Sequence, residues 1–182
     1  MTTGSESRRA IEVRFCGIGG MGVILASVIL GKSAILEQKS AVQTQTYGAE
    51  QRGTRVKGDV IISEEAMIIY PVIEKPDILV AFSQEAFDFY RSDAKDETQF
   101  FLNSDLVKSP RMLERVYKIP ASTIARDLKN EKAMNMILLG ALIKETSIVA
   151  KESAISAISE LVLKQNREVS LRAFLRGFEY FK

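Results

Sequence analysis

The sequence has 182 residues, of which 46% are hydrophobic and 26% are charged, and its formal net charge is +2. This composition is typical of a globular domain with a buried core, and the small net charge gives no reason to expect nucleic acid or an anionic membrane as a partner. Because the chain has one cysteine and no histidine, it cannot by itself form a disulfide, ligate an iron–sulfur cluster or provide a histidine general base.

The first part of the chain predicts a strand, a turn and a helix. Residues 1–9 are polar, and we expect them to form a disordered tail. No window has the apolar length of a signal peptide or a membrane span, which predicts a cytoplasmic protein. Residues 11–16 predict a first strand, and residues 23–36 predict a mostly buried helix. Residues 41–46 predict a second strand, after which residues 47–57 are expected to form a polar loop.

The rest of the chain continues this alternation. Residues 59–63 predict a third strand, and the unbroken apolar run 78–82 predicts a parallel strand buried on both faces. Ser83 is placed to cap a helix over residues 85–90. Two short strands and three helices are expected to follow, at residues 99–102, 116–119, 133–144, 151–163 and 170–180. This order predicts one α/β domain over residues 10–182, with a Rossmann-like open, mostly parallel sheet flanked by helices.

The turn after the first strand has the pattern G-x-G-x-x-G, with glycines at Gly17, Gly19, Gly20 and Gly22. In such a turn the first glycine permits a tight bend, the second lets a ligand approach the backbone, and the third lets the helix pack closely on the strand. The helix start then offers unpaired amide groups to a phosphate. The glycines therefore have three possible roles: binding a dinucleotide, packing the helix on the sheet, or binding another phosphate-bearing ligand or a partner chain.

The second strand argues against a dinucleotide. A dinucleotide site needs an acidic residue at the tip of this strand, about twenty residues after the glycines, to hold the ribose hydroxyls. The sequence offers Gln43, Thr44 and Gln45 there, while Glu37 comes too early and Glu50 lies in the predicted loop. We therefore prefer the reading in which the turn binds a different phosphate-bearing ligand or a partner chain.

Residues 43–57 form a polar run with almost no apolar residue and with cations at Arg52, Arg55 and Lys57. By itself such a run is a solvated surface loop. If the first two strands lie side by side, the loop meets the glycine turn at the carboxyl edge of the sheet, where open α/β sheets bind ligands. We therefore expect these cations to lie near the turn.

Several blocks of the sequence carry a family resemblance. They are residues 14–31 (RFCGIGGMGVILASVILG), 43–63 (QTQTYGAEQRGTRVKGDVIIS) and 70–90 (YPVIEKPDILVAFSQEAFDFY), followed by Ile119-Pro120-Ala121, Asn135 and Leu139-Gly140. In this order and spacing they resemble the gamma subunits of 2-oxoacid:ferredoxin oxidoreductases, although Met21 stands where Gln is usual. The run Gln-Thr-Gln-Thr-Tyr-Gly is closest to the 2-oxoglutarate branch.

This resemblance implies one subunit of an enzyme that oxidatively decarboxylates a 2-oxoacid, here 2-oxoglutarate, with coenzyme A. The products are succinyl-CoA and carbon dioxide, and the electrons pass to ferredoxin. The resemblance places thiamine diphosphate, Mg²⁺ and the iron–sulfur clusters in partner subunits, namely thiamine-binding alpha and beta subunits and a ferredoxin-like subunit. We therefore expect no cofactor, metal-binding residue or catalytic residue in this chain, and no activity from the chain alone.

The resemblance also associates this domain with coenzyme A binding. The matching segments are the turn at Gly19 and Gly20 and the loop at Glu50, Gln51 and Arg52. Pyruvate-specific relatives have lysines in this loop, so the side chain that contacts the anion is left open. Two alternatives also stay open: the beta subunit of an indolepyruvate ferredoxin oxidoreductase, which shares these features, and a non-catalytic nucleotide-binding Rossmann-like module.

Overall fold

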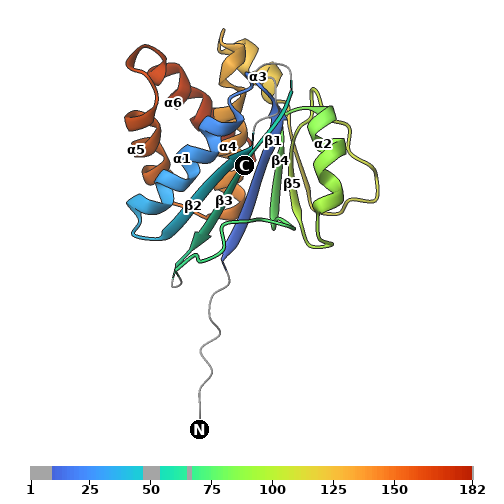
Figure 1. Ribbon diagram of the computed structural model, residues 1–182. Helices are drawn as coiled ribbons and strands as arrows, with labels where there is room; N and C mark the ends of the chain where they lie inside the picture. The colour runs from blue at the N-terminus through green and yellow to red at the C-terminus, as the bar shows by residue number, and fades with distance from the viewer. Residues whose placement is uncertain (1–9, 47–53, 65–66, 182) are drawn as a thin grey trace.

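A six-stranded sheet runs through the centre of the structure, with helices packed on both of its faces (Figure 1). The structure is a computed structural model that describes residues 10–46, 54–64 and 67–181. The predicted tail, residues 1–9, lies outside the described residues. The three-layer arrangement confirms the predicted α/β class, and the described residues form one domain.

The strands follow the order β2-β3-β1-β4-β5-β6. Their bounds are β1 Ile11–Ile18, β2 Ser40–Thr46, β3 Arg55–Ser63, β4 Ile78–Ala81, β5 Gln99–Asn103 and β6 Val116–Ile119. The strands β1, β4, β5 and β6 pair in parallel, whereas β3 runs antiparallel to both β1 and β2. The sheet is therefore mostly parallel, as predicted, and β4 is buried along its whole length.

The first two strands do not meet the condition considered for them, and the predicted start of the third strand is wrong. The strands β1 and β2 do not lie side by side, because β3 is inserted between them. In addition, β3 begins at Arg55 rather than at residue 59, so the predicted loop is shorter. In the sequence the charged residues Arg55 and Lys57 resemble loop residues. In the structure they belong to the strand, and the buried Val56 between them points to the opposite face of the sheet. They belong to the face of the sheet that is opposite to α1.

The helices divide unequally between the two faces. Their bounds are α1 Val23–Leu36, α2 Gln84–Tyr90, α3 Ala121–Asp127, α4 Met134–Thr146, α5 Lys151–Leu161 and α6 Lys164–Phe178, with short 3-10 helices η1 Arg91–Asp93 and η2 Glu131–Ala133. Figure 1 shows α1, α4, α5 and α6 on one side of the sheet and α2 on the other. The sequence did not predict α3, and α6 begins six residues before its predicted start at residue 170. Ser83 caps α2 as predicted, since its hydroxyl accepts a hydrogen bond from the Ala86 amide (3.4 Å).

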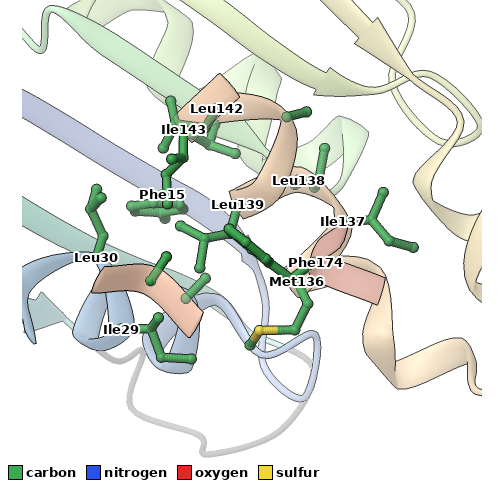
Figure 2. Close-up of a cluster of buried hydrophobic side chains, with 14 of the residues drawn as sticks. Phe15, Ile29, Leu30, Met136, Ile137, Leu138, Leu139, Leu142, Ile143 and Phe174 are labelled. Carbon is green, nitrogen blue, oxygen red and sulfur yellow. The ribbon is translucent and has the colours of Figure 1, made fainter. Parts of the chain in front are cut away.

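The larger core lies on the face covered by α1, α4, α5 and α6. Figure 2 shows Phe15 of β1, Leu139 of α4 and Phe174 of α6 among its buried side chains. The helices α4 and α6 touch through their backbones, because a side chain at Gly140 or Gly177 would overlap the main chain of the opposite helix. Phe174 thus packs in the core.

The opposite face is smaller and contains a buried charge. The Arg14 side chain is 1% exposed, and its Nε and Nη2 both donate to the Asp59 carboxylate at 2.9 Å. Its remaining donors bind Asp93 and the carbonyl oxygen of Ile73, each at 2.6 Å. Burial opposes the charge of Arg14, but the hydrogen bonds and charge of Asp59 together with the charge of Asp93 outweigh it and raise the pKa of the guanidinium. This network fastens η1 and the segment after β3 to the sheet.

Candidate functional site

The glycine turn lies at the carboxyl end of β1, beside the carboxyl end of β4. Gly17 is still part of β1, and a Cβ there would lie 2.8 Å from Val23 and 2.9 Å from the Cβ of Phe82. The amide of Gly19 donates to the carbonyl oxygen of Thr54 (3.0 Å), which joins the turn to the start of β3. These two glycines therefore serve the packing and closure of the turn.

Gly20 differs from its neighbours because it faces open space. Its φ is +100°, and a Cβ built there meets no atom within 4 Å. Only glycine adopts this conformation without strain, and the missing side chain leaves the backbone accessible to a ligand. Gly20 thus meets the steric requirement for the close approach of a phosphate.

Gly22 joins the turn to α4. It is the N-cap of α1 with φ +75°, and a Cβ there would overlap the side-chain amide of Asn135. That amide donates through Nδ2 to the Gly22 carbonyl oxygen (3.2 Å), while its Oδ1 accepts from the Met136 amide (2.9 Å). Asn135, which belongs to the blocks of the family resemblance, therefore holds the start of α1 against the start of α4.

A cleft of about 480 Å³ opens beside the turn. Its volume lies in the range of pockets that hold small ligands, roughly 300–1,000 Å³. The lining comes from the starts of α1, α4 and α6 and from the segments that precede them: Gly20, Gly22, Leu25, Asn130, Lys132, Ala133, Asn135, Met136, Val162, Gln165, Asn166 and Ser170. Because amide groups at a helix start lack intrahelical partners and the helix dipole is positive there, this geometry favours an anionic ligand.

The cations predicted to lie near the turn are arranged differently. Arg55 forms an ion pair with Glu85 (2.8 Å) and stacks on the ring of Phe89, with 4.4 Å between its Cζ and the ring centre. Lys57 lies 3.2 Å from the Asp59 carboxylate. Arg55 pairs with Ile18 and Lys57 with Cys16 in the sheet, so their backbones lie beside the turn as expected, but both side chains are held on the α2 face. The predicted loop residues Glu50, Gln51 and Arg52 lie outside the described residues.

Sequence reasoning missed the part of the cleft that comes from α6 and from the segment before α4. Lys132, Gln165, Asn166 and Ser170 line the cleft but attracted no attention in the sequence. The polar start of α6 hid its first six residues, whereas the apolar residues at 171, 174, 175 and 178 have helical spacing and indicated the rest. Their position beside the glycine turn depends on how the helices pack, which the sequence did not reveal.

The described residues do not fit a metal or a covalent catalytic centre. They contain no group of three or more histidine, cysteine, aspartate and glutamate side chains that could hold a metal ion. Cys16 is fully buried, and burial raises the pKa of its thiol, which disfavours the thiolate that a nucleophile or a metal ligand requires. No helix in the described part of the chain is long and apolar enough to cross a membrane.

Comparisons with known proteins agree with the fold. The chain is 46% identical over 176 residues to the 2-oxoglutarate synthase subunit KorC of Methanocaldococcus jannaschii, covering 94% of each chain. It is 38% identical to the gamma subunit of a keto/oxoacid ferredoxin oxidoreductase from Geobacter sulfurreducens, whose crystal structure superposes with a TM-score of 0.81 and covers 93% of this chain and 96% of that one.

A more distant structure shows the same fold inside a longer chain. The 2-oxoglutarate:ferredoxin oxidoreductase of Magnetococcus marinus, solved with 2-oxoglutarate, coenzyme A and succinyl-CoA bound, is 22% identical with a TM-score of 0.85. The match covers 94% of this chain and 31% of that chain. The family model for pyruvate ferredoxin/flavodoxin oxidoreductase matches residues 12–180. The chain therefore belongs to the pyruvate ferredoxin/flavodoxin oxidoreductase family.

Proposed function

We propose that the cleft at the glycine turn is where this chain, as the gamma subunit of a 2-oxoglutarate:ferredoxin oxidoreductase, binds part of coenzyme A. The observation that carries this proposal is the contrast within the turn. Gly17 and Gly22 have no space for a side chain, whereas Gly20 is open and lines a cleft at the start of α1. Simple packing of a helix on a sheet accounts for the first two glycines but not for Gly20.

The structure gives a dinucleotide less support than coenzyme A. Glu37, at the far end of α1, accepts a hydrogen bond from the Ala150 amide (2.6 Å) and lies 3.0 Å from the Lys39 ammonium, so it is not free to bind a ribose. Gln43 donates to Ser27 and to a main-chain carbonyl. An acidic partner for the ribose is therefore missing from the described part of the second strand.

The proposed division of labour follows from what the chain contains. The enzyme converts 2-oxoglutarate and coenzyme A to succinyl-CoA and carbon dioxide, and the electron pair released goes to ferredoxin. Thiamine diphosphate supplies the decarboxylation chemistry, and we propose that it is held by thiamine-binding alpha and beta subunits, with iron–sulfur clusters in a ferredoxin-like subunit. The role of this chain is to bind and orient coenzyme A through backbone amides and polar side chains.

An exposed apolar segment supports an assembly with other chains. Met67 and Ile69 are 84% and 88% exposed, and the neighbouring Tyr70 and Val72 are also exposed. Large apolar side chains gathered on a surface in this way mark interaction sites. We therefore expect co-expression with the thiamine-binding subunits to give a stable complex, whereas the isolated chain should not oxidise 2-oxoglutarate with any electron acceptor.

The test of coenzyme A binding is the Michaelis constant for coenzyme A in the assembled enzyme. Gly20→Val should raise it strongly, because a branched side chain occupies the space that the phosphate needs. Gly20→Ala is the control for backbone strain, which costs about 1–3 kcal/mol at a positive φ whatever the side chain. Arg52→Ala should raise the constant about tenfold to hundredfold if this guanidinium binds the anion.

Unchanged Michaelis constants in Gly20→Val and Arg52→Ala, with the complex intact, would place coenzyme A elsewhere. The substrate is tested separately, by comparing kcat/KM for 2-oxoglutarate, pyruvate and indolepyruvate. A preference for indolepyruvate would favour the alternative enzyme of the same family.

A further inference from the structure

The helices of this domain start in two different ways. At α2, α3 and α5 a side chain binds an amide at or next to the first turn: Ser83 accepts from Ala86, Asp105 from Thr123 (2.7 Å), and Glu37 from Ala150 (2.6 Å). By contrast, α1, α4 and α6 have neither a hydrogen bond from a capping side chain nor an acidic residue in the first turn. These are the three helices whose starts line the cleft. Two amides near these starts bind a side chain: that of Met136 binds Asn135, and that of Lys132, in the 3-10 turn η2 that leads into α4, binds Asn130.

Ser170 provides an independent sign that this wall of the cleft receives a ligand. Its side chain lines the cleft, the residue is 9% exposed, and its hydroxyl has no hydrogen bond to any described residue. Hydroxyls within helices ordinarily bind a carbonyl of the preceding turn. Ser33 does so with Ile29 and Thr146 with Leu142, both at 2.7 Å. The Ser170 hydroxyl instead borders the open cleft, where it is available to a ligand.

Lys132 adds a positive charge to the same wall. It is exposed, it lines the cleft, and no ion pair joins it to another described residue. The amide of Lys132 is fixed by the side chain of Asn130 (3.2 Å), so the residue is anchored at the mouth while its side chain is free to turn. A lysine in this position can approach an oxyanion as a mobile point charge.

We propose that the starts of α4 and α6, with Ser170 and Lys132, form a second phosphate-binding position in the cleft, besides the one at Gly20. This inference rests on the proposed function, because it assigns a second contact to the same ligand. A cleft with two such positions selects a ligand that carries more than one phosphate, as coenzyme A does. In this arrangement the Ser170 hydroxyl and the amides of α6 donate to one phosphate, and the turn donates to another.

The test uses the assembled enzyme and measures kcat and the Michaelis constant for coenzyme A. Ser170→Ala removes the hydroxyl and should raise the Michaelis constant about twofold to tenfold, while Ser170→Thr, which keeps it, should stay near the wild-type value. Lys132→Gln should produce a similar rise, and Lys118→Gln, an exposed lysine of β6 outside the cleft, should produce none. The kcat should not change. Inorganic pyrophosphate should compete with coenzyme A, and its inhibition constant should rise in the same two variants.

The pattern of results separates this inference from the proposed function. A raised Michaelis constant in Gly20→Val, together with unchanged values in Ser170→Ala and Lys132→Gln, would overturn the second position and leave the first. Unchanged values in all variants would remove both. A lower unfolding temperature of Ser170→Ala without any change in coenzyme A or pyrophosphate binding would show that the hydroxyl is merely structural, and would also overturn the inference.

Discussion

Polar groups gather both on the α2 face of the sheet and in the cleft at the glycine turn, but they are paired within the chain on the α2 face and largely unpaired in the cleft. On the α2 face the guanidinium of Arg14 is buried, and each of its nitrogens binds a carboxylate or a carbonyl oxygen. In the cleft, Gly20 borders open space, and the side chains of Lys132 and Ser170 have no hydrogen bond or ion pair with a described residue. The first arrangement is complete within the chain, whereas we propose that the second is completed by a ligand.

This difference predicts which variants affect stability and which affect binding. A buried ion pair that loses one partner leaves a desolvated charge, so the loss lowers the free energy of unfolding. An open group at a helix start contributes little to folding until a ligand binds it. Variants of the α2 face should therefore change the free energy of unfolding, and variants of the cleft should change coenzyme A binding, when both are measured on the same proteins.

The largest expected effect comes from Arg14. Arg14→Met should reduce the free energy of unfolding by about 3–5 kcal/mol, because Asp59 would remain buried without its two hydrogen bonds from Arg14 and with only Lys57 beside it. Denaturation by urea measures this loss. Arg55→Ala, which removes a half-exposed cation of the same face, should cost no more than about 1 kcal/mol and serves as the control. A loss at Arg14 as small as that at Arg55 would contradict the account of the α2 face.

A second variant should move stability and binding in opposite directions. Leu163 is the N-cap of α6, has an extended backbone and is 69% exposed. Leu163→Asp should stabilise the domain by about 0.5–2 kcal/mol by capping α6. The same carboxylate should raise the Michaelis constant for coenzyme A, because it brings an anion to the proposed phosphate position.

Leu163→Asn is the matched control for this variant, since asparagine caps a helix without adding charge. It should stabilise the domain as much as aspartate but affect the Michaelis constant less. Equal effects of aspartate and asparagine on coenzyme A binding would argue against an anion at the start of α6.

Removing the cap of α2 should have a smaller effect. Ser83→Ala should cost about 1 kcal/mol of unfolding free energy, since it removes the acceptor of the Ala86 amide. It should leave the Michaelis constant for coenzyme A unchanged, because α2 does not line the cleft. Thermal unfolding measures the loss of stability, and steady-state kinetics of the same preparation measure the Michaelis constant. A clear rise in the Michaelis constant would contradict the separate roles of the α2 face and the cleft.

The smallest effect concerns pH. Burial alone would raise the pKa of Glu37, but hydrogen bonds from Ala150, Lys39 and Ser153 lower it below its usual value. The folded pKa is thus below the unfolded value of about 4.3, so this contribution is full above pH 4.3 and is lost as pH falls through the folded pKa. Glu37→Gln should therefore be less stable than wild type at neutral pH, and the difference should shrink in acid. A constant difference down to pH 3 would contradict it.

The sequence predicted the elements with clear apolar patterns and missed those with charged or polar starts. The strand β4 and the helix α1 are apolar for most of their length, and both were placed within one residue of their ends. The start of β3 was missed because Arg55 and Lys57 look like loop residues until Glu85 and Asp59 are known to pair with them.

The candidate site was predictable only on one side. The glycine pattern requires a special backbone wherever it occurs, so it indicated the turn, although the open glycine is Gly20, at an intervening position, rather than the second glycine of the pattern, Gly19. The other wall comes from Lys132 and Ser170, more than a hundred residues later in the chain. Its position depends on the close contact of α4 with α6 at Gly140, which local patterns do not show.

Amide hydrogen exchange of the assembled enzyme, with and without saturating coenzyme A, tests the central claim most directly. The account predicts slower exchange at the starts of the three helices that line the cleft, in residues 20–25, 131–136 and 164–170, and no change in residues 84–93 of the α2 face. Protection of the α2 face with none at the three helix starts would contradict the assignment of the cleft as the coenzyme A site.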